Sequence, residues 1–318
     1  MSLFRKIFTL GQLVARGDGH EIFKKWRQFR NNQRVKKHSG KAFAFGDFGF
    51  PAVCHPDWID SLYEFLDLRC DQLELGVLAG WLAPGDAVMD IGTNLGVYSF
   101  CFCQKVGPSG EVISVDADNF IIQKLVEAKR ILSADQLQAV WGAVTEREGT
   151  VEFFIKPDQS ATSDQSLIPP KEIAQYLTPV AVPAFTVQSL LGRLQRKESL
   201  SLVKMDIEGA EASALKGVPV ELMNEEGPLW QIEINGQALE RFGNSPQEVV
   251  QHFSIERYDR WLIPKEPHKK IKEESRPRRL TEAETFQDAA YYNLICVPLG
   301  SKWKARRSAF LRNLGSLV

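Results

Sequence analysis

The feature that most constrains this chain is an alternation of short apolar segments with longer amphipathic ones, which runs from about residue 86 to residue 298. Segments such as DAVMDIG, GEVISVDAD and LQAVWGAV have the length and apolar content of buried strands. The segments NLGVYSFCFCQKV and NFIIQKLVEAKRIL between them have helical periodicity. After a polar stretch, the alternation resumes with SLSLVKMDIEG, PLWQIEING and YYNLICVP as strands. This order predicts an α/β fold with a doubly wound, mostly parallel sheet that is covered by helices on both faces.

The N-terminal part, residues 1–75, does not share this alternation and is predicted to form a helical extension and cover. Its first 40 residues contain ten basic residues and two acidic ones, and their apolar residues recur at helical spacing. This segment either packs on the main domain with a solvated basic face or binds an anionic membrane or another polyanion. Residues 299–318 are predicted to be a basic C-terminal tail.

The composition limits the class of protein. The formal net charge is −1, so the chain as a whole is not a polyelectrolyte binder. The five cysteines show no paired spacing, which predicts reduced core thiols in a reducing compartment. No apolar run approaches the roughly 18 residues that a membrane span needs. We therefore expect a cytoplasmic protein that at most touches a membrane surface.

The segment DIGTNLGVY, which follows the first predicted strand, combines a carboxylate with closely spaced glycines. Glycines allow the backbone to turn tightly and approach a ligand, and open α/β sheets bind ligands beyond the carboxyl ends of their strands. An aspartate that ends the second strand can accept hydrogen bonds from two ribose hydroxyls. The candidate cofactor-binding residues are Asp90, Gly92, Thr93, Asn94, Gly96, Asp116, Ala117, Gly142 and Ala143.

Two cofactors are compatible with a site of this kind. Asn94 stands where the second glycine of a dinucleotide motif, Gly-x-Gly-x-x-Gly, would lie. Asp90 beside the turn would repel a pyrophosphate but would suit a cationic amino acid group. S-adenosylmethionine carries an ammonium and a sulfonium group, so these residues favour it over NAD.

A second motif, LVKMDIEGAEASALKG, is more specific. With its Lys-x-Asp-x-Glu-Gly-x-Glu run it resembles the FkbM-like methyltransferases, and DIGTNLGVYS, VPAFTVQSLL and PLWQIEIN are similar to other segments of that family. The resemblance covers about residues 76–298. It implies a class I methyltransferase (Rossmann-like) fold that uses S-adenosylmethionine and usually methylates a hydroxyl of a sugar or another small metabolite.

The sequence departs from the family pattern at two positions. Ala117 replaces the proline that usually follows the ribose-binding acid, and Thr93 replaces an alanine. Both changes are small, so cofactor binding is still expected. The family varies widely in its substrates, so the resemblance does not identify the acceptor.

The candidate catalytic residues are acids at the ends of the fourth and fifth predicted strands and one histidine: Asp206, Glu208, Glu233 and His252. Two nearby carboxylates raise each other's pKa, so one of them could be the general base for a hydroxyl acceptor. The same carboxylates could instead hold a divalent cation, although no metal is predicted.

Several of these residues also have a purely structural interpretation. Glu208 and Glu211 could simply stabilise the N-terminus of the following helix. Lys204 could neutralise the acids or extend its ammonium group to solvent. His252 and the further candidate base His55 could be structural histidines.

A basic segment between the late strands, residues 265–280, is interpreted as a solvated loop or as a lid that recruits an anionic acceptor through Lys269, Lys270, Arg278 and Arg279. The basic segments also leave a nucleic-acid methyltransferase open as an alternative. A non-catalytic binding protein of the same fold is a second alternative. The expected partner is a small-molecule or glycan acceptor, with no specific nucleic acid.

Overall fold

The computed structural model describes residues 40–45, 49–53, 69–156, 165–264, 277–281 and 291–315. The predicted basic N-terminal helices, His55, Lys269 and Lys270 lie outside the described residues. None of the helices within the described ranges is long and apolar enough to cross a membrane.

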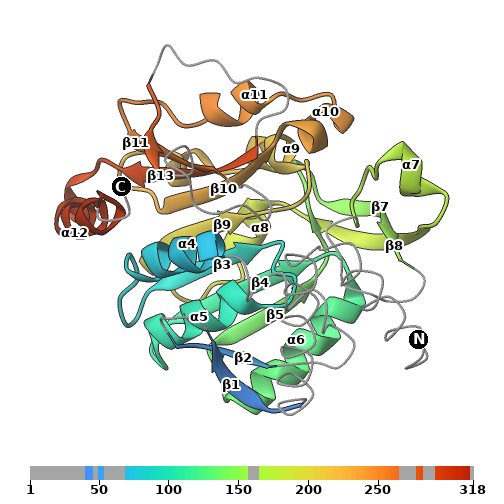
Figure 1. The fold of residues 1–318 in the computed structure, drawn as a ribbon, viewed down its shortest axis with the longest axis horizontal. Coiled ribbons are helices and arrows are strands. Elements are labelled where there is room, and N and C mark those ends of the chain that lie inside the picture. The colour runs from blue at the N-terminus through green and yellow to red at the C-terminus, as the bar shows by residue number, and fades with distance from the viewer. Residues whose placement is uncertain are drawn as a thin grey trace, which may run out of the picture.

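An eight-stranded sheet forms the centre of the protein (Figure 1). In spatial order its strands are β12 (Arg278–Arg279), β11 (Tyr258–Pro264), β13 (Tyr291–Pro298), β10 (Leu229–Asn235), β9 (Leu200–Met205), β3 (Ala87–Ile91), β4 (Glu111–Asp116) and β5 (Leu137–Trp141). Strands β5, β4, β3, β9 and β10 are parallel, and β13 is antiparallel to both β10 and β11. The predicted doubly wound, mostly parallel sheet is confirmed.

Helices cover both faces of this sheet (Figure 1). The core of one face includes residues of α4 (Arg69–Ala79), α5 (Val97–Val106), α6 (Asn119–Leu132) and α12 (Lys304–Gly315). The other face packs against α8 (Val187–Leu191), α9 (Glu211–Lys216), α10 (Gly236–Arg241) and α11 (Pro246–Gln251). Alternate strand residues therefore enter two separate cores, because successive side chains of a strand point to opposite faces.

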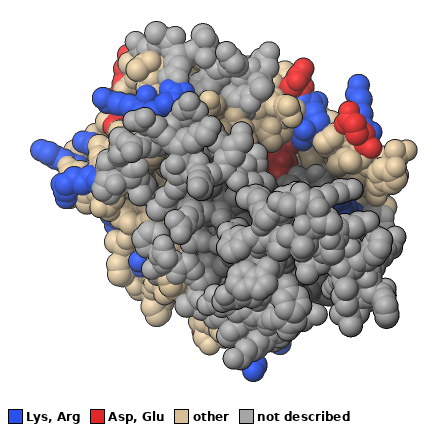
Figure 2. Space-filling view, viewed as in Figure 1, with Lys and Arg blue, Asp and Glu red and all other residues tan. Residues whose placement is uncertain are grey.

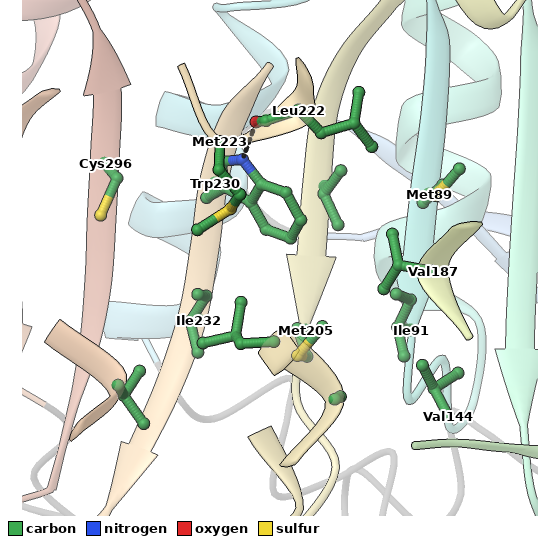
Figure 3. Close-up of a cluster of buried hydrophobic side chains, with 14 of the residues drawn as sticks. Met89, Ile91, Val144, Val187, Met205, Leu222, Met223, Trp230, Ile232 and Cys296 are labelled. Atoms are coloured by element: carbon green, nitrogen blue, oxygen red, sulfur yellow. Dashed lines mark hydrogen bonds between the residues drawn. The ribbon is translucent and has the colours of Figure 1, made fainter. Parts of the chain in front are cut away.

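The core on the α8–α11 face is apolar and closely packed (Figure 3). Trp230 is fully buried there and donates its indole N–H to the carbonyl oxygen of Leu222 at 3.2 Å. Cys296 lies in the same core, and Cys101 and Cys103 are buried on the α5 side. All three are free thiols, as the sequence predicts, and burial raises their pKa.

Two smaller sheets accompany the central one. A three-stranded sheet follows β5 in the chain, with the strand order β6 (Ala143–Val144), β8 (Thr178–Phe185) and β7 (Gly149–Ile155). The segment that connects β7 to β8 includes α7 (Lys171–Ala174). The hairpin of β1 (Ala42–Phe45) and β2 (Phe50–Val53) packs against α5. Short 3₁₀ helices occur at Lys197–Ser199, Val220–Leu222 and Ser301–Trp303.

The C-terminal segment is a packed helix rather than the predicted tail. Trp81 contacts both Trp303 and Phe310, with ring centroids 5.2 and 5.6 Å apart. Arg306 of α12 makes a two-armed ion pair with the buried carboxylate of Asp86, with N–O distances of 2.5 and 3.0 Å. Basic side chains gather on the molecular surface over α12 (Figure 2). These contacts fix the helix to the α4 face while its charges stay outside.

Candidate active site

The candidate site lies at the carboxyl edge of the central sheet. The order of the parallel strands reverses at β3, because β4 lies on one side of it and β9 on the other. Ligands of open α/β sheets bind in the crevice beyond the strands at such a reversal. Asp116 ends β4 and Asp206 directly follows β9, so both predicted carboxylates lie at this edge.

The glycine turn after β3 passes directly over the end of β9. Gly92 has φ +77°, and a Cβ atom there would lie 1.7 Å from the carbonyl oxygen of Asp206. Gly96 has φ +74°, and its Cβ would lie 2.3 Å from Leu125. At Gly92 backbone atoms leave no space for a side chain, and at both positions the positive φ favours glycine. The turn is therefore fixed against β9 on one side and against α6 on the other.

Asp116 is held by backbone groups in a form suited to binding a diol. Its two carboxylate oxygens accept hydrogen bonds from the N–H groups of Asn94 and Asp118, each at 2.9 Å. Burial raises its pKa to about 6, against the effect of these hydrogen bonds. A carboxylate oxygen can accept a second hydrogen bond, so Asp116 can still bind two hydroxyls. These acceptor oxygens therefore fit the two ribose hydroxyls of an adenosyl cofactor.

The other predicted cofactor-binding residues near Asp116, which are Ala117, Gly142 and Ala143, lie in three different environments. Ala117 is half-buried and follows Asp116 in the turn, and its carbonyl oxygen accepts a hydrogen bond from Trp141. Gly142 donates its N–H to the carbonyl oxygen of Asp116 at 2.9 Å. Ala143 is buried in β6, where it pairs with β8. Its methyl group therefore belongs to the second sheet rather than to an open surface.

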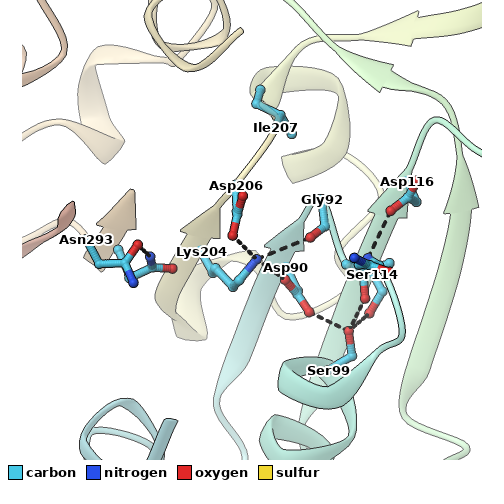
Figure 4. A network of polar contacts seen from close by, with 12 residues as sticks. Asp90, Gly92, Ser99, Ser114, Asp116, Lys204, Asp206, Ile207 and Asn293 are labelled. Carbon is cyan, nitrogen blue, oxygen red and sulfur yellow. Dashed lines mark hydrogen bonds and ion pairs between the residues drawn. The ribbon is translucent and has the colours of Figure 1, made fainter. Parts of the chain in front are cut away.

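Asp90 and Thr93 face the protein interior, which differs from the expected ligand contacts. Asp90 is fully buried, accepts a hydrogen bond from Ser99 at 2.5 Å and lies 3.4 Å from the ammonium nitrogen of Lys204 (Figure 4). The Thr93 hydroxyl lies 2.6 Å from that of Ser99, which also accepts a hydrogen bond from Ser114. Asp90 is expected to act through Lys204 and not as a direct partner of a cationic ligand, because a buried carboxylate needs a partner within the protein.

Lys204 also lies at this site, although the sequence analysis did not place it among the candidate cofactor-binding or catalytic residues. Its ammonium group is buried and donates a hydrogen bond to the Gly92 carbonyl oxygen at 3.2 Å. It lies 3.8 Å from Asp206 Oδ2 and 5.1 Å from the centroid of the Tyr98 ring. The sequence shows a lysine within an apolar strand, but it does not decide between a paired ammonium group and one that extends to solvent.

Three of the predicted acids come together. Carboxylate oxygens of Asp206, Glu208 and Glu233 lie within 4.8 Å of one another. Asp206 has 24% of its side chain exposed, whereas Glu233 is only 3% exposed. Oxygen ligands at such spacing could hold a divalent cation, and they could equally accept a proton from a bound hydroxyl.

Glu211 holds the turn that carries these acids. Its carboxylate accepts hydrogen bonds from the backbone N–H groups of Ile207 and Gly209, at 2.8 and 3.0 Å. Glu208 between them has φ +56°, and its carbonyl oxygen accepts hydrogen bonds from Ser166 and Arg241. Burial and the nearby Glu233 raise the pKa of Glu211 to about 8. Glu211 therefore shapes the loop directly, beyond any effect on the helix dipole.

The structure does not bring His252 to this cluster. His252 is half-buried at the end of α11, where burial and the charge of Lys216 lower its pKa. Helix α9 begins at Glu211 beside the acids and ends at Lys216, so His252 lies near the far end of that helix. This position, at the end of α9 away from the acids, does not support a catalytic role for His252.

The described part of the predicted lid is a short edge strand. Residues Arg278 and Arg279 form β12, which pairs with β11. Arg279 donates a hydrogen bond to Asp259 at 2.5 Å, and Arg278 lies 5.9 Å from the centroid of the Tyr292 ring. These two arginines are thus ordered by the sheet, and the lid itself stays a prediction.

Residues 90–260, just over half of the chain, match the family model described as the methyltransferase FkbM domain. No curated protein sequence matches the chain.

Among solved structures, the chain is similar to methyltransferase FkbM from Methylobacillus flagellatus KT, with 14% identity and a TM-score of 0.41 over 85% of this chain. That alignment spans 59% of the relative's own length, less than two thirds. An rRNA methylase from Streptococcus thermophilus has 10% identity and a TM-score of 0.42, with 73% and 98% of the two chains covered. Fibrillarin from Aeropyrum pernix, with bound S-adenosyl-L-methionine, has 9% identity and a TM-score of 0.38, with 71% and 74% covered.

We predict that Gly92→Ala will lower the free energy of unfolding by more than about 4 kcal/mol, because a methyl group has no space beside the Asp206 carbonyl oxygen. Gly243→Ala is the matched control, since Gly243 also has positive φ, +71°, but nothing lies within 4 Å of its Cβ position. It should cost only the positive-φ backbone conformation, about 1–2 kcal/mol. Urea denaturation of both variants measures the difference, and equal losses would contradict the close approach.

We also predict that the stability of the protein falls as the pH rises from 7 to 8. The folded-state pKa of Glu211, about 8, lies above its ordinary value of 4.5, so the folded protein keeps a proton that the unfolded chain has released. The stability that this proton provides is lost progressively as the pH rises from about 4.5 to about 8, with a slope of at most about 1.4 kcal/mol per pH unit that vanishes above pH 8. Urea denaturation at several pH values should show a smaller slope in Glu211→Gln. The same slope in both proteins would rule out Glu211 as its source.

Proposed function

Because the chain belongs to the FkbM methyltransferase family, we propose that it transfers a methyl group from S-adenosylmethionine to a hydroxyl of a sugar, a glycan or another small metabolite. The observation that carries this proposal is the cluster of Asp206, Glu208 and Glu233 beside the glycine turn. A hydroxyl acceptor needs a group that takes its proton, and carboxylates at this position supply one.

The cofactor residues have separate tasks in this proposal. Asp116 would bind the ribose hydroxyls, and the turn of residues 92–96 would bring backbone atoms close to the cofactor. When bound, S-adenosylmethionine supplies a methyl group that is already activated by the positive sulfur. The protein therefore needs no covalent intermediate, and its main contribution is to align the acceptor and remove a proton.

Asp206 is the best candidate for that proton transfer. It is the more exposed of the two strand-end acids, so a bound hydroxyl can reach it, whereas Glu233 is almost fully buried. Lys204, at 3.8 Å, and the backbone bond from Asp206 N–H to the Ile91 carbonyl oxygen hold it in place. Glu233 would then contribute negative charge next to Asp206 without contacting the acceptor itself.

The proposal predicts different defects for two variants. Asp206→Asn should bind S-adenosylhomocysteine normally but lower methyl transfer to hydroxyl acceptors by about 10²–10⁴-fold, because it removes the proton acceptor. Asp116→Ala should weaken S-adenosylhomocysteine binding by at least about tenfold, or about 1.4 kcal/mol, because it loses a charge-assisted hydrogen bond. Calorimetry measures binding, and transfer of labelled methyl groups to a panel of saccharides and other hydroxylated metabolites measures turnover.

The controls separate the remaining alternatives. A folded wild-type protein that does not bind S-adenosylhomocysteine would contradict the proposal and favour a non-catalytic role. Labelling of RNA in preference to all hydroxylated small molecules would favour the nucleic-acid alternative. Loss of turnover in EDTA that Mg²⁺ restores would show that the acids hold a metal instead of taking the proton directly.

A further inference from the structure

Tyr291 is an exposed aromatic residue at the carboxyl edge of the central sheet. It is the first residue of β13, which is antiparallel to β10, so it lies at the edge where β10 ends. Its side chain is 38% exposed, whereas Asn293 and Ile295, which follow on the same face of the strand, are buried. The surface of the protein on this face therefore begins between Asn293 and Tyr291.

The strand register places Tyr291 just outside the acid cluster. Glu233 pairs with Asn293, and Asn235 pairs with Tyr291. Because paired residues point to the same face, Tyr291 and Glu233 are diagonal neighbours on that face, a separation that aromatic side chains can reach across. Tyr291 also lies two residues further toward the ligand edge than the row of Glu233. A ligand that contacts the acids from outside therefore lies beside the tyrosine ring.

Tyr291 lies on the side of the acids that the cofactor leaves open. In the strand order, Asp116 of β4 and Tyr291 of β13 are on opposite sides of Asp206, which follows β9. Figure 4 shows the same arrangement, with Asn293 and Asp116 on opposite sides of Lys204 and Asp206. A cofactor that is held by Asp116 and reaches Asp206 across the glycine turn leaves the β10 and β13 side to the acceptor.

An aromatic face beside several carboxylates matches the chemistry of a saccharide ring. The carboxylates of Asp206, Glu208 and Glu233 accept hydrogen bonds from hydroxyl groups. The C–H groups on the face of a saccharide ring form an apolar surface that packs against an aromatic ring. Tyrosine suits such a place at the edge of the protein, because its ring is apolar while its hydroxyl can stay hydrated.

We propose that Tyr291 forms the surface on which the ring of a saccharide acceptor stacks. This inference rests on the function proposed above, because it takes the acid cluster as the side of the site that receives the acceptor proton. An open-chain hydroxyl compound has no ring face to offer, so Tyr291 favours cyclic acceptors over open-chain ones. The regular pairing of β13 with β10 fixes the backbone at Tyr291, so little conformational freedom is lost when a ring stacks there.

Two substitutions separate stacking from a role of the tyrosine hydroxyl. Tyr291→Phe keeps the aromatic face and removes the hydroxyl, whereas Tyr291→Leu keeps apolar bulk and removes the aromatic face. Stacking predicts that the KM for a methyl glycoside stays within about twofold of wild type in Tyr291→Phe and rises about 3- to 10-fold in Tyr291→Leu. The kcat and the affinity for S-adenosylhomocysteine should change little in either variant, because the lost contact is the same in the ground state and the transition state. Tyr176→Leu is the matched control, since Tyr176 is 69% exposed next to α7, away from β13 (Figure 1).

Saturation-transfer NMR gives a second readout that needs no turnover. The probes are the methyl glycosides of glucose, mannose and galactose, added to protein that is saturated with S-adenosylhomocysteine and irradiated in its aromatic region. The wild type and Tyr291→Phe should transfer magnetisation to the ring C–H protons of a bound glycoside. Tyr291→Leu should lose most of this transfer, and Tyr176→Leu should keep it. Thermal melting verifies that each variant is folded.

The outcomes distinguish this inference from the proposed function. A wild type that binds S-adenosylhomocysteine but none of the glycosides would overturn stacking and leave methyl transfer to other hydroxyls intact. Unchanged KM and magnetisation transfer in Tyr291→Leu would also overturn it. Equal losses in Tyr291→Phe and Tyr291→Leu would overturn it as well, because the hydroxyl and not the ring face would then make the contact. Failure of the folded wild type to bind S-adenosylhomocysteine would overturn both.

Discussion

The rest of the site depends on the contacts that the ammonium group of Lys204 makes with its neighbours. It is buried between Asp90 of β3, the carbonyl oxygen of Gly92 and the carboxylate of Asp206 (Figure 4). A buried charge is stable only when it is paired and hydrogen-bonded, so Lys204 and Asp90 require each other. Because their strands are not consecutive in the chain, this pair also joins β3 to β9 at the point where the strand order reverses.

This arrangement couples the two halves of the site. The glycine turn, which is proposed to bind the cofactor, contacts the Asp206 carbonyl oxygen through Gly92, and Lys204 contacts both the Gly92 carbonyl oxygen and the Asp206 carboxylate. On the acceptor side, Glu211 binds two backbone N–H groups of the loop that carries Asp206 and Glu208. Neither loop can shift without disturbing the other, and in the proposed function this coupling would keep a fixed distance between the cofactor and the proton acceptor.

Local pattern was sufficient to predict the sheet, the glycine turn and the strand-end acids. The apolar pattern of β3, β4 and β9 follows from the burial of these strands alone. The carboxyl ends of parallel strands meet at one edge of the sheet, whichever segments connect the strands. The direction of Lys204 was not predictable, because a strand lysine can extend to solvent or be paired inside, and its register with Asp90 involves more than 100 residues of intervening chain. The same limit applies to His252, whose distance from the acids depends on the course of α9 and α11, and to α12, whose docking depends on Asp86.

The charge balance of the site explains why a cationic cofactor suits it. Asp206, Glu208, Glu211 and Glu233 lie close enough to influence one another, while Lys204, which contacts Asp206, is shared with Asp90. Excess negative charge at a partly buried edge is costly, and the pKa of Glu211 is raised by its burial and, to a smaller extent, by the nearby Glu233. A ligand that brings a positive sulfur offsets the remaining charge, whereas the neutral thioether left after methyl transfer does not. The same electrostatics therefore favour binding of the methyl donor over retention of its product.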